Sequence, residues 1–230
     1  MNKTYGSEWI RSMVSIVISP PTSLAIIRTR RPWVGVFLVV AGASILLALP
    51  SRDSVLAATS TALEGVDEQA AAAAPIFYYA TLALSPVFLV AEWLVAAVVI
   101  WLLVLAFGGT GRFAQAFSLA AHLGVINVLA QVTGVLVLAT TGGPQSPCAP
   151  SCTALGPNLL LSTESAALNA MYENITPFTV WQMALLCLGA VAVFGLSRTQ
   201  AAWLASIFWT AGTAFMVATA SLGAVATPLE

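Results

Sequence analysis

The chain has 230 residues, of which 59% are hydrophobic and 7% are charged, and its formal net charge is −1 at pH 7. Roughly a quarter of the residues in an average soluble domain are charged, so this composition excludes a soluble globular protein. The near-zero net charge gives no basis for nucleic-acid binding. The sequence therefore predicts a membrane domain, with the lipid bilayer as a partner and no nucleic acid among its partners.

Residues 1–32 are predicted to form a cytoplasmic amphipathic segment ahead of the first membrane span. Its apolar side chains recur at helical spacing: Trp9, Met13, Ile16 and Val17. A helix of this kind lies in a membrane interface. The sequence Ser19-Pro20-Pro21-Thr22 ends it, because proline disfavours helix in the residue before it. We therefore expect a collar at the inner leaflet.

Five apolar segments follow, each close to the roughly 20 helical residues that cross a hydrocarbon core. They are expected at about residues 33–49, 85–107, 113–140, 178–194 and 201–224. The second is placed after Pro86, which divides a longer apolar run. No period-2 alternation suggests a barrel, and helices satisfy their own backbone groups in lipid. The predicted fold class is all-α: a polytopic membrane protein with five transmembrane helices in one domain, residues 33–226, plus an N-terminal amphipathic interfacial helix.

The charges orient these spans. All but one of the eight Lys and Arg residues fall on one side of them: Lys3, Arg11, Arg28, Arg30, Arg31, Arg112 and Arg198. Basic loops stay in the cytoplasm during insertion, so the N-terminus is predicted to be cytoplasmic and the C-terminus outside, in a bacterial cytoplasmic membrane. The segment Thr29-Arg30-Arg31 also mimics a twin-arginine export signal. A first helix that is not cleaved off is favoured, because the arginines are equally explained by holding the inner end of the first span in the cytoplasm.

Two substantial outer segments are expected, at about residues 50–76 and 141–177. Cys148 and Cys152 lie four apart in the second, on the face that is oxidising in a bacterial envelope, so a disulfide is favoured. Free thiols are the alternative, and a metal site is the least favoured because no His is near. A redox-sensing loop is a further hypothesis. Cys187, within the fourth span, is expected to be ordinary packing.

Glu92 is the only acidic residue within a predicted span, about 10 Å from its outer end, and charges in lipid are costly and by default functional. Asn127 and Gln131 are expected at a similar depth, and His122 deeper toward the cytoplasm. These four residues form the predicted intramembrane polar cluster. The favoured interpretation is a structural contact, with amide side chains holding Glu92 in the bundle interior. The alternative is a relay in a small permease or proton-coupled carrier.

The sequence carries no pattern typical of catalysis. It lacks the Gly-x-x-x-x-Gly-Lys-Ser/Thr loop, the His-Glu-x-x-His motif and the Gly-x-Ser-x-Gly context. Gly108-Gly109-Thr110-Gly111 is not preceded by a strand, so a tight turn between helices is expected instead of a phosphate cradle. The sequence therefore predicts a protein that is not an enzyme and that has no cofactor and no metal.

A set of short motifs in this order resembles the Yip family of membrane proteins, named for Ypt-interacting protein, in its bacterial branch. The motifs are Trp9 with Ser19-Pro20-Pro21-Thr22, Arg30-Arg31-Pro32-Trp33, Gly108-Gly109-Thr110-Gly111-Arg112-Phe113 with Phe117, and Thr176-Pro177-Phe178-Thr179-Val180-Trp181, followed by Gly189 and Gly195-Leu196-Ser197. Their order and spacing cover nearly the whole chain. The motif positions carried over are Pro20, Arg31, Trp33, Gly108, Gly109, Pro177, Phe178 and Trp181.

The resemblance implies five spans, a cytoplasmic N-terminus and a scaffold in place of a catalyst. Eukaryotic members bind Rab-type GTPases in vesicle trafficking, a role that is not carried over to a chain that looks bacterial. Some bacterial members resemble accessory partners of ABC exporters. The chain departs from the family in its long outer segments, and Ala121-His122-Leu123-Gly124 lacks the tyrosine and proline expected nearby. We therefore expect a non-enzymatic membrane scaffold or accessory protein that assembles with a membrane-protein partner, with an ABC exporter as one candidate, or with itself as a homo-oligomer.

Overall fold

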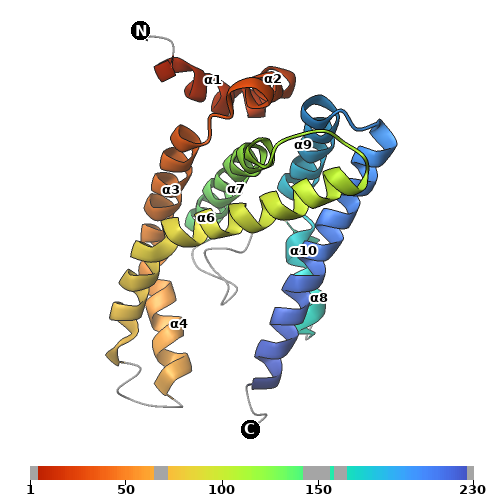
Figure 1. Cartoon of the computed structure of the whole chain (residues 1–230). Helices are drawn as coiled ribbons and strands as arrows, with labels where there is room; N and C mark the ends of the chain where they lie inside the picture. Colours follow the sequence, from red (N-terminus) through yellow and green to blue (C-terminus); the bar gives the residue numbers. More distant parts are fainter. Residues whose placement is uncertain (1–4, 65–71, 142–155, 158–164, 227–230) are drawn as a thin grey trace.

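The computed structural model describes residues 5–64, 72–141, 156–157 and 165–226, and these residues form helices and contain no strand (Figure 1). The predicted all-α class is confirmed for them. The elements are α1 (Tyr5–Ile18), α2 (Pro20–Arg30), α3 (Val34–Ala48), the 3-10 turn η1 (Leu49–Ser51), α4 (Arg52–Glu64), α6 (Ala74–Ala106), α7 (Phe113–Thr141), α8 (Ala166–Asn174), α9 (Pro177–Phe194) and α10 (Arg198–Ala226).

Within the described residues, four helices are long and apolar enough to cross a membrane, namely α6, α7, α9 and α10. They correspond to the last four predicted spans. The first predicted span, 33–49, is the 15-residue helix α3, which rises only about 22 Å. The chain then continues through η1 into α4 along the same side of the bundle (Figure 1). The structure thus supports four of the five predicted spans by length, and α3 is a shorter apolar helix.

Helix α6 corrects the prediction that Pro86 divides the second apolar run. The helix is continuous over 33 residues with Pro86 inside it. Proline has no N–H to donate to the carbonyl of Leu82, and the hydroxyl of Ser85 donates to that carbonyl instead, at 2.8 Å. Because the freed acceptor is satisfied, the helix passes the proline in an apolar setting. Along its length α6 turns from a course beside α3 to one that crosses α7 (Figure 1).

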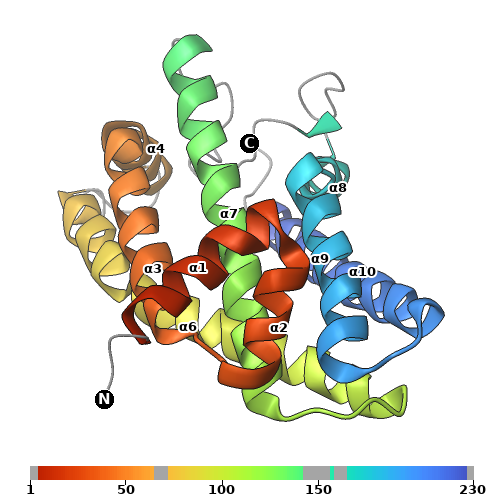
Figure 2. The ribbon, with the colours of Figure 1, turned by 90° about the horizontal axis from the view of Figure 1, so that it is seen from above.

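The N-terminal helices α1 and α2 form a hairpin that lies on one end of the bundle (Figures 1 and 2). The hairpin breaks at Ser19, as the Ser-Pro-Pro-Thr sequence predicted. The apolar face predicted for α1 points into the protein, since Ile16 is fully buried and Trp9, Met13 and Val17 are half-buried. The face that the sequence analysis assigned to the membrane interface is therefore a contact with the protein itself.

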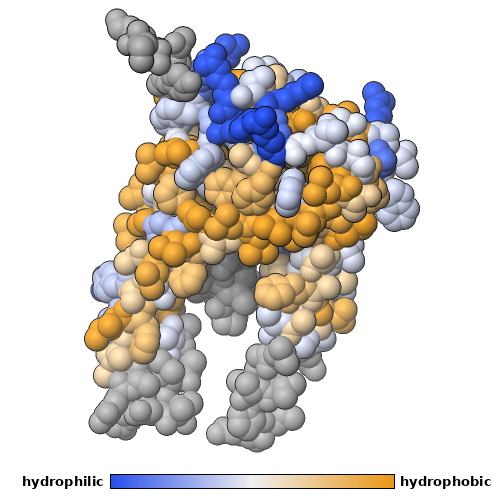
Figure 3. All heavy atoms as spheres, in the orientation of Figure 1, coloured by the Kyte–Doolittle hydropathy of each residue, from blue (hydrophilic) through white to orange (hydrophobic). Residues whose placement is uncertain are grey.

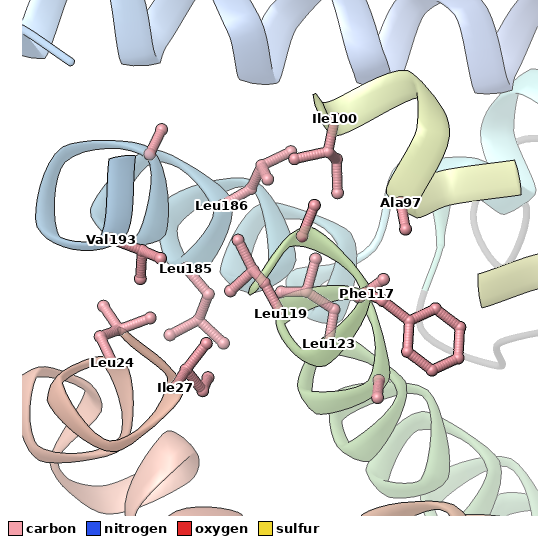
Figure 4. Packing of buried hydrophobic residues seen from close by; sticks show 14 of the residues in the cluster. Leu24, Ile27, Ala97, Ile100, Phe117, Leu119, Leu123, Leu185, Leu186 and Val193 are labelled. Carbon is pink, nitrogen blue, oxygen red and sulfur yellow. The ribbon is translucent and has the colours of Figure 1, made fainter. Parts of the chain in front are cut away.

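The hydrophobic core lies around α7, which contacts α3, α6, α9 and both hairpin helices. From α7 it includes Leu119 and Leu123, and from α6 it includes Ala97 and Ile100 (Figure 4). Residues of the hairpin complete it, because Leu24 and Ile27 of α2 face Leu185 and Val193 of α9 (Figure 4). The core is thus shared between the spans and the N-terminal segment.

The three connections that carry arginines meet at one end of the bundle. The side chain of Gln200 donates to the carbonyl of Phe107 at 2.9 Å, and the amide of Thr110 donates to the carbonyl of Phe194 at 3.0 Å. We call this end the basic end; its arginines are Arg11, Arg28, Arg30, Arg31, Arg112 and Arg198. Hydrophilic residues gather there above a broad apolar band (Figure 3).

The opposite end carries the start of α9 and the short helix α8. The Thr176 hydroxyl accepts a hydrogen bond from the amide of Thr179 at 3.1 Å, and Pro177 occupies the first turn, one residue before the predicted start of the fourth span. Helix α8 packs against α10, and the amide of Asn174 donates to the hydroxyl of Thr213. Thus α8 lies within the second outer segment predicted at about residues 141–177.

Replacing Gly124 with alanine tests the packing of α6 on α7. A Cβ at this position would lie 2.8 Å from Cζ2 of Trp93, a ring that is 2% exposed. We expect Gly124→Ala to cost about 1–3 kcal/mol of stability, because the core has no room for the added methyl group. The measurement is thermal unfolding in mild detergent.

The matched control is Gly212→Ala on α10, where an added Cβ would meet nothing within 4 Å. Alanine favours helix over glycine by about 1 kcal/mol, so this variant is expected to be neutral or stabilising. Equal unfolding temperatures for the two variants would contradict the described contact between Trp93 and Gly124.

Candidate functional site: the basic end and the polar residues of the spans

His122 joins the hairpin to the centre of the bundle. Its ring is completely buried in α7, and Nδ1 lies 2.7 Å from the carbonyl oxygen of Ser118. A carbonyl only accepts, so Nδ1 carries a proton, and in the neutral ring Nε2 is an acceptor. The Ser12 hydroxyl of α1 lies 3.1 Å from Nε2 and 2.8 Å from the carbonyl oxygen of Trp9, so its one proton is shared between these two acceptors. The contact therefore couples α1 to α7 through two buried polar groups.

Gln115, at the start of α7, bridges two basic segments. Its side-chain nitrogen donates to the carbonyl of Arg28 at 2.8 Å, and its side-chain oxygen accepts from the amide of Arg112 at 2.8 Å. At the surface, Arg30 forms an ion pair with Glu8 at 3.0 Å, an exposed contact of small energetic value. The arginines of α2 and of the turn before α7 are thereby held close together at the basic end.

Glu92 lies apart from these contacts. Its side chain is exposed on α6, and among the described residues none hydrogen-bonds or ion-pairs with its carboxylate. Glu92 lies 18 residues, about 27 Å, along α6 from Ala74. Its predicted distance of about 10 Å from the outer end of the membrane span stays a prediction. The structure therefore shows no amide side chain holding Glu92 in the bundle interior.

The two amides of α7 do not meet Glu92 either. Asn127 accepts a hydrogen bond from the side chain of Gln182 on α9, and Gln182 also lies 3.3 Å from the carbonyl of Leu123. Gln131 is half-buried. Of the predicted cluster, His122 and Asn127 thus have separate partners, and the structure does not bring the four residues together.

The cysteines fall into two groups. Cys148 and Cys152 lie outside the described residues, so their predicted disulfide stays a prediction. Cys187 is a half-buried free cysteine in α9, and its sulfur lies 3.5 Å from the carbonyl of Ala201 on α10. This position is the helix packing expected for it.

Comparison with known families identifies the family of this chain. The family model of the Yip1 domain matches residues 14–219. The chain belongs to the Yip1 domain family. This family is not known as enzymatic. Among curated proteins and among solved structures, nothing matches the chain significantly.

Three of the motif positions predicted from the resemblance shape the hairpin and its exit. Pro20 occupies the first turn of α2, where a missing N–H costs nothing. Arg31 ends α2 in the left-handed conformation, with φ 51°. Trp33 then packs edge-on against Phe117 of α7, with ring centroids 5.3 Å apart. Together they turn the chain from the hairpin into α3.

Glycines of the Yip1 domain form the turn between α6 and α7. Gly108 has φ 74°, which glycine adopts without steric cost. A Cβ on Gly109 would lie 2.8 Å from side chains of Val104 and Leu196, so the backbone approaches the core closely there. The tight turn that the sequence predicted for these glycines is confirmed by this geometry.

The remaining motif positions start α9 at the opposite end of the Yip1 domain. Pro177 occupies the first turn, next to the Thr176 cap. Phe178 and Trp181 are half-buried and pack against the hydrophobic core. These side chains fix the first turn of α9 against its neighbours.

Sequence reasoning missed three side chains that make these contacts, Ser12, Gln115 and Gln182. Ser118 contributes only its backbone carbonyl, and its buried hydroxyl has no hydrogen-bond partner among the described residues. A signal was present on α7, because Gln115 and His122 are seven residues apart and share one helix face. A polar stripe on an otherwise apolar helix indicates partners on a neighbouring element. The identity of those partners on α1 and α2 depends on tertiary packing.

Removing the Ser12 hydroxyl tests the coupling between α1 and α7. We expect Ser12→Ala to lower stability by about 1–3 kcal/mol, because Nε2 of His122 stays buried without a partner. It should also speed trypsin cleavage after Arg11, since the hairpin opens more readily. Thermal unfolding and limited proteolysis in detergent measure both effects.

Ser15→Ala is the matched control on the same helix. Ser15 is buried as well, but its hydroxyl donates only to the carbonyl of Ser12 within α1. We expect this variant to behave like the wild type in both measurements. A Ser12→Ala protein indistinguishable from Ser15→Ala would overturn the coupling role.

Proposed function

We propose that this chain is a non-enzymatic membrane scaffold or accessory protein that assembles with another membrane protein, with an ABC exporter as a candidate, or with itself. The observation that carries the proposal is the hairpin fixed on the basic end by buried contacts. Ile16, Leu24 and Ile27 are at most 1% exposed, so the hairpin has a defined position on the spans. A rigid surface of this kind suits the docking of a partner.

The charge of this surface indicates how a partner is held. The side chains of Arg11, Arg28, Arg112 and Arg198 are exposed. Arg11 and Arg28 lie in the hairpin, Arg112 lies in the turn before α7, and Arg198 starts α10. The side-chain contacts of Gln115 and Gln200 hold the backbones of these segments together. Fixed positive charges favour acidic side chains on a partner and fix its register. The partner proposed here therefore presents acidic residues to the basic end.

The proposal includes an orientation. The basic end faces the cytoplasm of a bacterial cell and the C-terminus lies outside, because basic loops stay inside during insertion. This orientation needs α3 as a fifth crossing, continued by η1 and α4. The exposed stripe Ile10, Val14 and Ile18 of α1 then faces the inner leaflet, which is the proposed form of the interfacial collar. The division into residues 1–32 and 33–226 stays a prediction.

Neutralising the exposed arginines tests the docking surface. We expect the combined change Arg11→Gln, Arg28→Gln and Arg198→Gln to reduce the amount of co-purifying membrane partner by about threefold or more, because the complementary charges are lost. The tagged protein is purified from its native membrane in mild detergent, and the proteins that accompany it are quantified by mass spectrometry.

The control is Arg52→Gln, an exposed arginine at the start of α4 away from the basic end. It should leave co-purification unchanged. Because arginines also set orientation, a Thr199→Cys label shows whether each variant keeps the basic end inside. If the triple variant keeps its orientation and still recovers as much of the partner as the wild type does, docking at the basic end is contradicted.

A small proton-coupled carrier is the second candidate, and the exposed carboxylate of Glu92 within α6 is the observation that favours it. The scaffold proposal expects vesicles with wild-type protein and with Glu92→Gln to show the same proton flux as empty vesicles, measured with an enclosed pH dye. A flux present in the wild type and lost in Glu92→Gln would replace the scaffold by the carrier.

A further inference from the structure

Helix α6 uses only one narrow face to pack in the bundle. Its buried residues are Trp93, Ala97, Ile100 and Val104, which follow one another at spacings of three and four. In the most apolar stretch of α6, only 22% of the residues are buried. Most of the surface of α6 therefore faces away from the rest of the described chain.

A second regular stripe lies on the exposed side and includes Glu92. Its positions alternate in spacing between four and three residues: Thr81, Ser85, Phe88, Glu92, Val95, Val99 and Leu102. This is the repeat by which one helix presents side chains to another helix in a coiled-coil contact. Phe88, Val95 and Leu102 on it are 59%, 66% and 53% exposed. We call these seven residues the α6 seam.

The seam combines apolar side chains with one ionisable group that has no partner. Lipid alone covers an apolar stripe well, but it solvates a carboxylate poorly, and charged groups in spans pair with other charges or with polar groups. The described residues supply no such group to Glu92. His122 is held by Ser118 and Ser12, and Asn127 is held by Gln182.

A second copy of the chain is a poor match for this position. The described spans contain no Lys or Arg between Phe113 and Phe194 or within Ala74–Ala106, so a copy would offer no cation at this depth. A symmetric contact along the seam would instead place one Glu92 opposite the other, and like charges oppose each other. A second copy thus offers no cation opposite Glu92, which favours a different chain as the source of the complementary charge.

We infer that the α6 seam receives a transmembrane helix of a different membrane protein, and that this helix carries a Lys or Arg opposite Glu92. The inference rests on the proposed scaffold function and names the chemistry of its partner. The apolar seam residues supply packing, and the charge pair sets the depth and register of the incoming helix.

Site-specific photocrosslinking in the native membrane tests the inference. A photoreactive residue is placed at Val95 on the seam, or at Val87, which is 63% exposed but lies about 140° around the helix from Glu92. We expect an adduct from position 95 and not from position 87. Mass spectrometry of the adduct should identify a transmembrane peptide that contains Lys or Arg.

The charge pair is tested in the same adduct. Glu92→Ala should lower the yield from position 95 by about tenfold or more, because the cation of the partner is left unpaired. Glu92→Lys should abolish the adduct, and changing the basic residue of the partner to Glu should restore it. Restoration excludes a general loss of folding as the cause.

The other outcomes separate this inference from the scaffold proposal. An adduct with a second copy, or with a helix that has no basic residue, overturns the inference while assembly stands. The inference is also overturned, and assembly also stands, if a partner co-purifies but position 95 gives only lipid adducts. If no membrane protein co-purifies and no copy associates, the scaffold proposal itself fails.

Discussion

The structure depends on the complete burial of the first part of α7. Every residue from 115 to 124 is buried, so this stretch of a membrane helix has no lipid-facing side. Helices α3, α6 and α9 cover it on three sides, and the α1–α2 hairpin covers the remaining one. The hairpin is therefore a wall of the bundle and not an appendage to it.

Burial on all sides also decides how the polar residues of α7 are used. Gln115 and His122 have no access to water or lipid headgroups, so each needs a partner within the protein. Both find one on the hairpin: the carbonyl of Arg28 for Gln115 and the hydroxyl of Ser12 for His122. Because these bonds are directional, they fix the position of the hairpin more closely than apolar contacts alone would. The polar groups at the basic end thus contribute specificity to the packing.

Local chemistry made much of this fold predictable. The all-α class, the break at Ser19, the glycine turn before α7 and the Thr176 cap follow from backbone preferences that act over a few residues. Two expectations were wrong, one because a side-chain hydrogen bond compensates for a proline and one because tertiary packing covers a helix face. Proline should have ended the helix at Pro86, but the hydroxyl of the neighbouring Ser85 replaces the missing donor. The apolar face of α1 was assigned to lipid because amphipathicity does not reveal which apolar surface a helix meets. In the described part of the chain no hydrogen bond joins the four residues of the predicted polar cluster; His122 is held by Ser12 and Asn127 by Gln182.

The continuity of α6 leaves Glu92 in the middle of a long helix. It is 18 residues from Ala74 and 14 from Ala106, about 27 Å and 21 Å along the axis. The 33-residue helix is about 50 Å long and exceeds the roughly 30 Å hydrocarbon core, so its ends are not the membrane surfaces. A carboxylate within lipid pairs with another charge or with a polar group at its own depth. Among the described residues none hydrogen-bonds or ion-pairs with Glu92, and its complement is therefore expected on another molecule.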